Sequence, residues 1–268
     1  MFAVRTLLGV ALGGAIALPA GSQALSADAR SRPAVVPFQN GEMLTYDLRF
    51  GAIKIGTGRM RVLGQDSVRD RFAWHVRFSV TGGTFFYKVN DVYESWMDTQ
   101  TLNSLRYRQD LNQGSRERQR IWEIYPERAT YRELTRNGPE RPSVSSPLDD
   151  GSFLYFVRTV PLEVGQTYSF NRYFRPDRNP VIIRVLRRER VRVPAGEFDA
   201  IVIQPIIKTV GIFAEGGQAE IWLSDDDRRL MIQMKTRMSF GTLNLFLRSF
   251  RLNDSAEPVG IDHTDSLP

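Results

Sequence analysis

Two pairs of acidic residues are the side chains in this sequence whose spacing could support acid–base catalysis. Glu94 and Asp98 lie in one segment that is predicted to be a strand, and Glu197 and Asp199 lie in another. Side chains two residues apart on a strand share a face at about 6.6 Å, and a retaining glycosidase holds its two carboxyl groups ~5 Å apart. Solvent-facing acids among many arginines are more often cross-strand ion pairs, each worth under ~1 kcal/mol. A glycan hydrolase is therefore only a third hypothesis, and no catalytic residue is predicted.

The other residue types that carry out catalysis or bind metals are scarce. The chain has no cysteine, which excludes thiol catalysis, iron–sulfur clusters and cysteine-bound zinc, and its histidines are His75 and His263. A Ser-His-Asp triad would have to use His75, and Ser152 does not lie in the Gly-x-Ser-x-Gly pattern of α/β-hydrolases. The three aspartates at 225–227 lack the spacing of a calcium loop, and we interpret them as a turn. No metal and no cofactor is predicted.

The first 27 residues have the features of a signal peptide. Arg5 is positively charged, residues 7–18 are apolar, and small residues follow as far as Ala24 and Ala27. The apolar run is shorter than the ~20 residues that a membrane-spanning helix needs. We expect export and cleavage near Ala24 or Ala27, which gives a periplasmic or secreted mature protein with no transmembrane span. Because a lipoprotein is anchored through a cysteine, we expect no lipid anchor.

The chain is basic, with a formal net charge of +6, and 32 of its 36 basic residues are arginines. The simplest interpretation is the base composition of the genome. The functional alternative is affinity for anionic material of the cell envelope, such as lipid head groups or acidic glycans. The basic residues alternate through predicted strands instead of forming one block, which disfavours nucleic acid as a partner.

Alternation of apolar and polar residues with a period of two dominates the mature chain. One run shows it most clearly, because every second residue is large and apolar: Phe72, Trp74, Val76, Phe78 and Val80. About a dozen such runs, separated by turn signals, predict an all-β protein with one large antiparallel sheet. Gly56 and Gly58 lie inside one run, where glycine often marks a bend. We therefore expect the sheet to be strongly curved into a half-barrel or a barrel.

The same pattern gives the division of the chain. We expect a signal peptide at 1–27, a flexible N-terminal segment at 28–39, a single β-rich domain at 40–251 and a flexible C-terminal tail at 252–268. No linker rich in Gly, Ser or Pro interrupts the middle of the chain, which favours one domain over two.

One segment follows a helical period instead. Asp149 and Asp150 stand where a helix N-cap belongs, and Pro161 ends the run. Between them, four apolar residues recur with the spacing of one helical face: Phe153, Phe156, Val157 and Val160. The segment predicts one short helix packed on the sheet.

Several motifs in a fixed order resemble a known family. They are Gly41-Glu42-x-Leu44-x-Tyr46, the stretch Asn90 to Asp98, the helix at 152–158 with Pro161 and Gly165, the turn Val193 to Phe198, and Ala219 to Asp226. Together they resemble the bacterial exported family called domain of unknown function 3108 over roughly residues 40–250. The resemblance implies a β-rich protein of the cell envelope. It supplies no catalytic or binding residue.

Two glycine-rich loops, at 82–87 and 210–217, carry large apolar side chains where loops are usually polar. They could form a mouth, a lid or a docking edge, or could fold back onto the core, and the sequence leaves both readings open. We therefore expect a non-catalytic module that binds an apolar or amphiphilic, lipid-like molecule of the envelope. The alternative is a structural or assembly protein that acts through protein contacts. The candidate ligand-binding residues are Trp74, Phe78, Phe85, Phe86, Tyr87, Trp96, Phe153 and Phe213.

Overall fold

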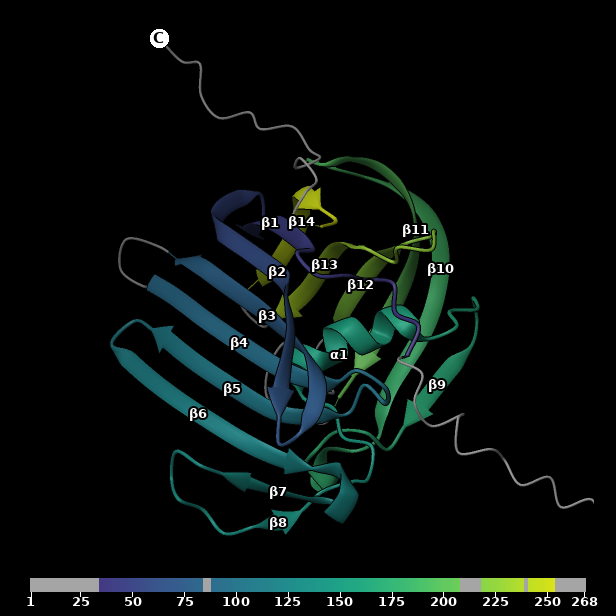
Figure 1. Ribbon diagram of the computed structural model, residues 1–268. Helices are drawn as coiled ribbons and strands as arrows, with labels where there is room; N and C mark the ends of the chain where they lie inside the picture. Colours follow the sequence, from purple (N-terminus) through teal and green to yellow (C-terminus); the bar gives the residue numbers. More distant parts are fainter. Residues whose placement is uncertain (1–33, 84–87, 208–217, 239–240, 254–268) are drawn as a thin grey trace, which may run out of the picture. The chain divides into compact units, whose positions relative to one another are not determined.

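The computed structural model of the chain describes residues 34–83, 88–207, 218–238 and 241–253. The chain divides into two units, 1–32 and 33–268, and all described residues belong to the second. Fourteen antiparallel strands form one sheet, with α1 (Asp150–Phe156) beside it (Figure 1). The first strands are β1 (Met43–Phe50), β2 (Ile53–Val68), β3 (Arg71–Gly83), β4 (Lys88–Asp98), β5 (Ser104–Gln113), β6 (Arg116–Tyr125), β7 (Thr130–Glu133) and β8 (Arg141–Pro142). The others are β9 (Thr167–Phe170), β10 (Val181–Val193), β11 (Gly196–Ile206), β12 (Gln218–Ser224), β13 (Met231–Met238) and β14 (Gly241–Arg251). Short 3-10 helices lie at Pro126–Arg128, Val157–Thr159 and Pro176–Arg178.

The sheet is a double meander that starts from the two ends of the chain. Its strand order is β8-β7-β6-β5-β4-β3-β2-β1-β14-β13-β12-β11-β10-β9, so the first and last strands are neighbours in the middle. Leu44 of β1 lies opposite Phe250 of β14, and Leu48 lies opposite Leu245. The prediction of an all-β protein with one large antiparallel sheet is therefore confirmed.

The prediction that this sheet closes or curls strongly is wrong, because the sheet is open. Within the described residues the edge strands β8 and β9 each pair with a single neighbour. β8 has two residues, one of them Pro142, which has no backbone N–H to donate. β9 has four. Short edge strands and proline are means by which proteins prevent further strand pairing.

Two glycines of the central strands, Gly56 and Gly82, lie where two backbones approach closely. Gly56 of β2 lies opposite Gly82 of β3. A Cβ atom added to Gly56 would lie 2.6 Å from the Cα of Gly82 and 2.3 Å from the carbonyl oxygen of Thr81. These glycines therefore permit a close approach of two backbones, which no other residue would allow.

The short helix forms where the sequence predicts it, with Asp149 as its N-cap. The Asp149 carboxylate accepts hydrogen bonds from the backbone N–H groups of Gly151 and Ser152, and the Ser152 hydroxyl accepts one from the N–H of Asp149. This reciprocal arrangement is a capping box. Every helical residue from Gly151 to Phe156 is buried, so the helix is enclosed on all sides and not only along the predicted apolar face.

The helix defines two faces of the sheet. Ser95 of β4 donates to Asp149 at 2.5 Å, and Tyr107 of β5 donates to Asp150 at 3.0 Å, so these two side chains point to the helix. We call this side the helix face and the other side the opposite face. The main hydrophobic core includes Phe153 of α1 itself and side chains from most of the strands.

Candidate functional site

The first polar group on the helix face is buried around Asp149. One carboxylate oxygen of Asp149 accepts the Ser95 hydroxyl at 2.5 Å and two backbone N–H groups at 2.9 Å. The Ser104 hydroxyl lies 2.8 Å from that of Ser152 and accepts the N–H of Asp149. Burial raises the pKa of the Asp149 carboxyl to about 6, and its second oxygen is buried without a hydrogen-bond partner. The group positions the helix on β4 and β5, and the buried Ser152 is part of this cap.

The second polar group is half-buried and surrounds Asp150. Its carboxylate accepts the hydroxyl of Tyr107 and the hydroxyl of Tyr173, each at 3.0 Å. The amide of Gln109 donates to the Tyr107 hydroxyl at 2.6 Å and lies 3.4 Å from the carboxylate. Burial raises the pKa of both tyrosines well above the ordinary value, which keeps them protonated as donors. The acceptor capacity of Asp150 is thus used within the protein.

The third group places positive charge on an aromatic surface. Trp122 of β6 stacks on Tyr107, with ring centroids 5.2 Å apart. The guanidinium of Arg175 lies 5.2 Å from the Trp122 ring centroid, and that of Arg120 lies 6.0 Å from it. The indole of Trp122 therefore holds two cations beside the Asp150 group, an arrangement that aromatic rings favour.

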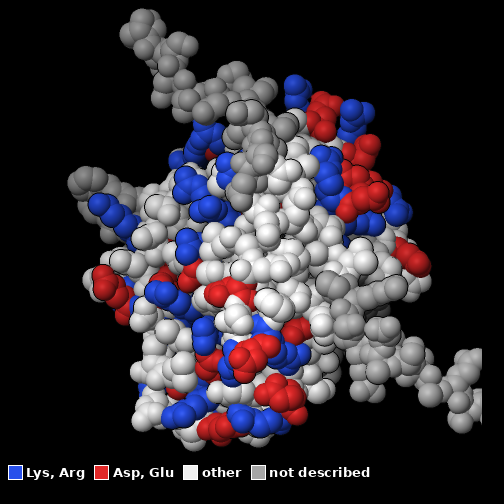
Figure 2. Space-filling model, in the orientation of Figure 1, with Lys and Arg blue, Asp and Glu red and all other residues white. Residues whose placement is uncertain are grey.

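Between these groups and one end of the sheet, the helix face carries apolar side chains that are only half-buried. β1, β3 and β5 all finish at this end, because they run in the same direction in the sheet. Val80 of β3, Tyr93 of β4 and Leu111 of β5 lie on the helix face here and are half-buried. We call these three side chains the apolar strip; the buried Asp91 lies directly opposite Val80 on the same face. Figure 2 shows mostly uncharged side chains in the middle of the view, where Figure 1 shows α1, with charges of both signs around them; the strip lies nearer the ends of β3 and β5.

The predicted aromatic residues divide between the two faces. Trp74, Phe78 and Phe153 belong to the main core on the helix face, where Trp74 packs edge-on against Phe38 with centroids 5.5 Å apart. Trp96 lies on the opposite face in a small separate cluster with Val68, Ala73 and Leu105. Including Trp96 in one surface with Trp74 was therefore wrong. Phe85, Phe86, Tyr87 and Phe213 lie outside the described residues.

The first predicted carboxylate pair lies on the opposite face and is held by cations. Glu94 Oε1 lies 3.3 Å from His75 Nε2 and 2.6 Å from an Arg77 nitrogen. These contacts, with His75 contributing most, lower the pKa of Glu94 to about 2. The His75 ring also stacks on Trp96 at 4.2 Å. A carboxylate that stays ionised in this way is a poor general acid.

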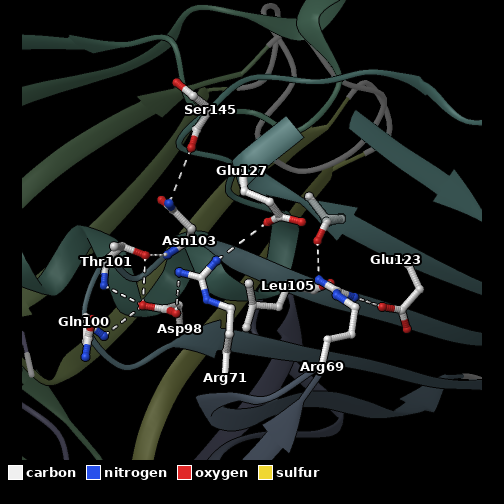
Figure 3. A network of polar contacts seen from close by, with 11 residues as sticks. Arg69, Arg71, Asp98, Gln100, Thr101, Asn103, Leu105, Glu123, Glu127 and Ser145 are labelled. Carbon is white, nitrogen blue, oxygen red and sulfur yellow. Dashed lines mark hydrogen bonds and ion pairs between the residues drawn. The ribbon is translucent and has the colours of Figure 1, made fainter. Parts of the chain in front are cut away.

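Asp98, the other member of that pair, closes a turn (Figure 3). One of its oxygens accepts the backbone N–H groups of Gln100 and Thr101 at 2.9 and 2.8 Å. The other oxygen lies 2.8 Å from the guanidinium of Arg71. Figure 3 shows Arg69 beside Arg71, where it donates to the carbonyl of Leu105 and pairs with Glu123. These bonds fasten the β2–β3 turn over β5 and β6.

Glu197 and Asp199 belong to the β10–β11 hairpin and form no catalytic pair either. Glu197 is exposed and pairs with Arg190 at 3.1 Å. The turn itself returns to the middle of the sheet, where the Ala195 N–H donates to the carbonyl of Leu247 at 3.0 Å. The stretch is a hairpin whose turn docks on β14, with Glu197 in a surface ion pair and Asp199 exposed.

The aspartates at 225–227 form a turn, as predicted. Asp226 accepts the hydroxyl of Ser224 at 2.7 Å and the backbone N–H of Arg228 at 3.1 Å. In the described parts of the chain, no group of three or more His, Asp or Glu side chains could hold a metal ion. No helix in those parts is both long enough and apolar enough to cross a membrane.

Sequence reasoning missed the residues that give the helix face its polar character: Tyr107, Arg120, Trp122, Tyr173 and Arg175. A signal for some of them was present, because Arg118, Arg120 and Trp122 alternate along one predicted strand and must share a face. Nothing in the sequence indicates that Arg175, more than fifty residues later, lies against the same indole.

Comparison with known proteins agrees with this fold. The crystal structure of a beta-barrel-like protein of domain of unknown function DUF1849 from Brucella abortus matches with a TM-score of 0.54 at 9% identity, over 82% of this chain and 100% of that one. A protein from Parabacteroides distasonis matches with a TM-score of 0.37 at 10% identity, over 82% and 100%. The protein CT021 from Chlamydia trachomatis matches with a TM-score of 0.35 at 10% identity, over 86% and 93%. No curated protein matches the sequence.

At such low identity the Brucella structure shows the fold alone. The sequence itself matches the model of one family over residues 45–248, which is most of the chain and includes every strand except the start of β1 and the end of β14. The family is described as "Protein of unknown function (DUF3108)". The chain belongs to this family, as the order of its motifs predicts.

Proposed function

We propose that the helix face binds an amphiphilic molecule, with its apolar part on the strip formed by Val80, Tyr93 and Leu111. The observation that carries the proposal is the juxtaposition on one face of a half-buried apolar strip and a polar border. Tyr93 lies directly opposite Gln109, and Gln109 contacts the Asp150 group. Exposed apolar surface bordered by polar groups is typical of ligand and interaction sites.

The expected affinity is modest. A chain that covers roughly 200 Å² of apolar surface gains about 5 kcal/mol at ~25 cal/mol per Å², before the cost of immobilising the ligand. Such a gain corresponds to a dissociation constant of about 0.2 mM, and the immobilisation cost moves it into the millimolar range. Export to the cell envelope, which the signal peptide predicts, would bring the protein close to amphiphilic molecules.

Titration of the purified protein with monomeric dodecyl maltoside, followed by calorimetry, tests the proposal. Because this detergent is uncharged, it reports on the apolar strip alone. We expect saturable binding that weakens several-fold in a Leu111→Asn variant. The matched control is Leu134→Asn, since Leu134 is exposed beyond β7. Absence of saturable binding, or equal weakening by both variants, would refute the proposal.

The second candidate function, assembly through protein contacts, is favoured by the free edge of β10. β9 pairs only with Val181 to Arg184 of β10, whereas β10 continues to Val193. Within the described residues no strand covers that second half, and such an edge can accept a strand from a partner. We expect Arg190→Pro to reduce cross-linking to an envelope partner, since proline removes a backbone donor. If cross-linking recovers no partner with the wild type or with the variant, this candidate function is refuted.

A further inference from the structure

The arginines on the helix face of β6 are in excess over the acids around them. Cross-strand pairing places Arg118 opposite Leu111 and Arg120 opposite Gln109. Arg120 Nε lies 3.7 Å from Glu133 Oε1, and Arg136 lies 3.6 Å from the same oxygen. One carboxylate thus serves two arginines at distances too long for hydrogen bonds.

Arg118 and Arg175 have fewer acidic partners than Arg120. Within the described ranges no carboxylate pairs with either guanidinium, and the Nε atom of Arg175 is buried without a hydrogen-bond partner. The Arg175 guanidinium is held by aromatic rings, at 5.2 Å from the Trp122 centroid and 5.1 Å from that of Phe174. Mutual repulsion among these cations contributes to a lowered pKa of Arg120, for which burial is the larger cause.

Two other acids on this part of the helix face, Asp150 and Asp91, accept hydrogen bonds from neutral groups, and among the described residues neither forms an ion pair with the arginines. The Asp150 carboxylate already accepts two tyrosine hydroxyls. Asp91 on β4 accepts the Gln113 amide at 2.5 Å and the N–H of Asn112 at 3.1 Å. The Nε atoms of Arg120 and Arg175 are buried donors without a hydrogen-bond partner. Guanidinium donors match phosphate, sulfate or carboxylate oxygens.

We propose that Arg118, Arg120 and Arg175 bind the anionic head group of the amphiphile, with Trp122 as the surface on which Arg120 and Arg175 rest. This inference rests on the proposed function, because it assigns the charge of the same ligand. Arg118 and Leu111 are directly opposite each other, and opposite side chains on paired strands have Cβ atoms about 4.5–5.5 Å apart. An anionic head group on the arginines would therefore leave its alkyl chain against the apolar strip.

Calorimetric titration with monomeric dodecyl phosphate tests the inference, with dodecyl maltoside and dodecyltrimethylammonium as the neutral and cationic probes of equal chain length. We expect dodecyl phosphate to bind at least about tenfold more tightly than dodecyl maltoside, the effect of gaining one or more charge-assisted hydrogen bonds. The cationic probe should bind most weakly. Raising the salt concentration should weaken dodecyl phosphate binding alone, because salt screens exposed charges.

Variants locate the effect. Arg118→Gln and Arg175→Gln should each weaken dodecyl phosphate binding about tenfold and leave dodecyl maltoside binding unchanged. Arg118 is exposed, so its variant carries little risk to folding. Arg192→Gln is the matched control, since the Arg192 side chain is 85% exposed on the β10–β11 hairpin. Equal affinities for the three probes, or equal effects of all three variants, would overturn the inference.

The outcomes separate this inference from the proposed function. If dodecyl maltoside binds and dodecyl phosphate binds no better, the apolar site exists and the anionic assignment is wrong. If inorganic phosphate displaces dodecyl phosphate at equal concentration, the arginines bind free anions and the amphiphile is not the ligand. If none of the three amphiphiles binds, both proposals fail together.

Discussion

The raised pKa of Asp149 predicts that this residue makes the protein less stable as the pH rises. A carboxyl group that is protonated more readily in the folded than in the unfolded chain favours the folded state at low pH. The folded pKa is about 6, and the unfolded value is ~3.9. The contribution of Asp149 to the free energy of unfolding should therefore fall as the pH rises from about 4 to about 6, and should stay constant above that. At ~1.4 kcal/mol per unit, the loss is about 3 kcal/mol.

An Asp149→Asn variant isolates this contribution. The amide oxygen can take the three hydrogen bonds of the carboxylate oxygen that accepts Ser95, Gly151 and Ser152. The amide nitrogen replaces the oxygen that has no partner. Asparagine is also an effective N-cap, so the helix should persist.

Urea unfolding of both chains between pH 4 and pH 7.5 measures the effect. The variant should gain about 3 kcal/mol relative to the wild type over that range, whatever its stability at pH 4. The test is how the difference in unfolding free energy between the variant and the wild type changes with pH, because every other titrating group is common to both proteins. A difference that stays constant from pH 4 to pH 7.5 would refute the assignment of the raised pKa to Asp149.

Three further predictions concern stability and can be measured by chemical unfolding. Glu42→Gln leaves Arg158, whose side chain is fully buried and 2.6 Å from Glu42, without its counter-charge, and should cost about 3–5 kcal/mol; a loss below ~1 kcal/mol would contradict it. Gly151→Ala puts a Cβ 2.4 Å from the Ser95 hydroxyl and should destabilise the protein, whereas adding Ser95→Gly should restore part of the loss; no restoration would mean that the strain lies elsewhere. Glu94 has a pKa lowered to about 2, so its contribution is present above pH ~4.5 and lost as the pH falls towards 2. In a Glu94→Gln variant, the free energy of unfolding should decrease less between pH 4.5 and pH 2 than in the wild type. An equal decrease in both proteins would show that the Glu94 ion pairs do not cause the loss of stability in acid.

Local patterns in the sequence predict the elements of this fold well. The alternation through Trp74, Val76 and Phe78 indicates a strand with one buried face. Val76 and Phe78 lie in the main core and Trp74 packs against it, whereas Phe72 at the start of the run is exposed. The capping residue Asp149 marks the start of the helix, and Pro161 follows its last turn. Each of these signals depends on neighbours within a few residues, which is why one sequence suffices to read them.

The placement of Trp96 shows where such reasoning failed although the information was present. On a strand, residues two apart share a face, so Trp96 must lie with Glu94 and Asp98. The structure confirms that grouping, because Glu94 and Trp96 both contact His75. Choosing residues by aromatic type instead of by strand parity put Trp96 on the wrong side of the sheet.

Other features depend on contacts between distant segments and could not be read from one sequence. The Glu42–Arg158 ion pair joins the start of β1 to the end of the helix across 116 positions. Arg175 reaches Trp122 from a loop between β9 and β10. Whether the sheet closes depends on two short edge strands, of which β8 has only two residues. These outcomes follow from the packing of the whole sheet and not from any local period.

The distribution of paired and unpaired charges is the basis on which we propose binding. On the opposite face, Glu94, Asp98 and Glu123 each contact at least one arginine, and Glu94 and Asp98 have further partners. A carboxyl group that acts as a general acid needs a pKa near the working pH, whereas this arrangement keeps Glu94 ionised. On the helix face the situation is reversed, because Arg118 and Arg175 have no carboxylate partner among the described residues and border an apolar strip. Our proposal of an anionic amphiphile rests on these unpaired guanidinium groups, whereas the acids of the opposite face are engaged in ion pairs within the sheet.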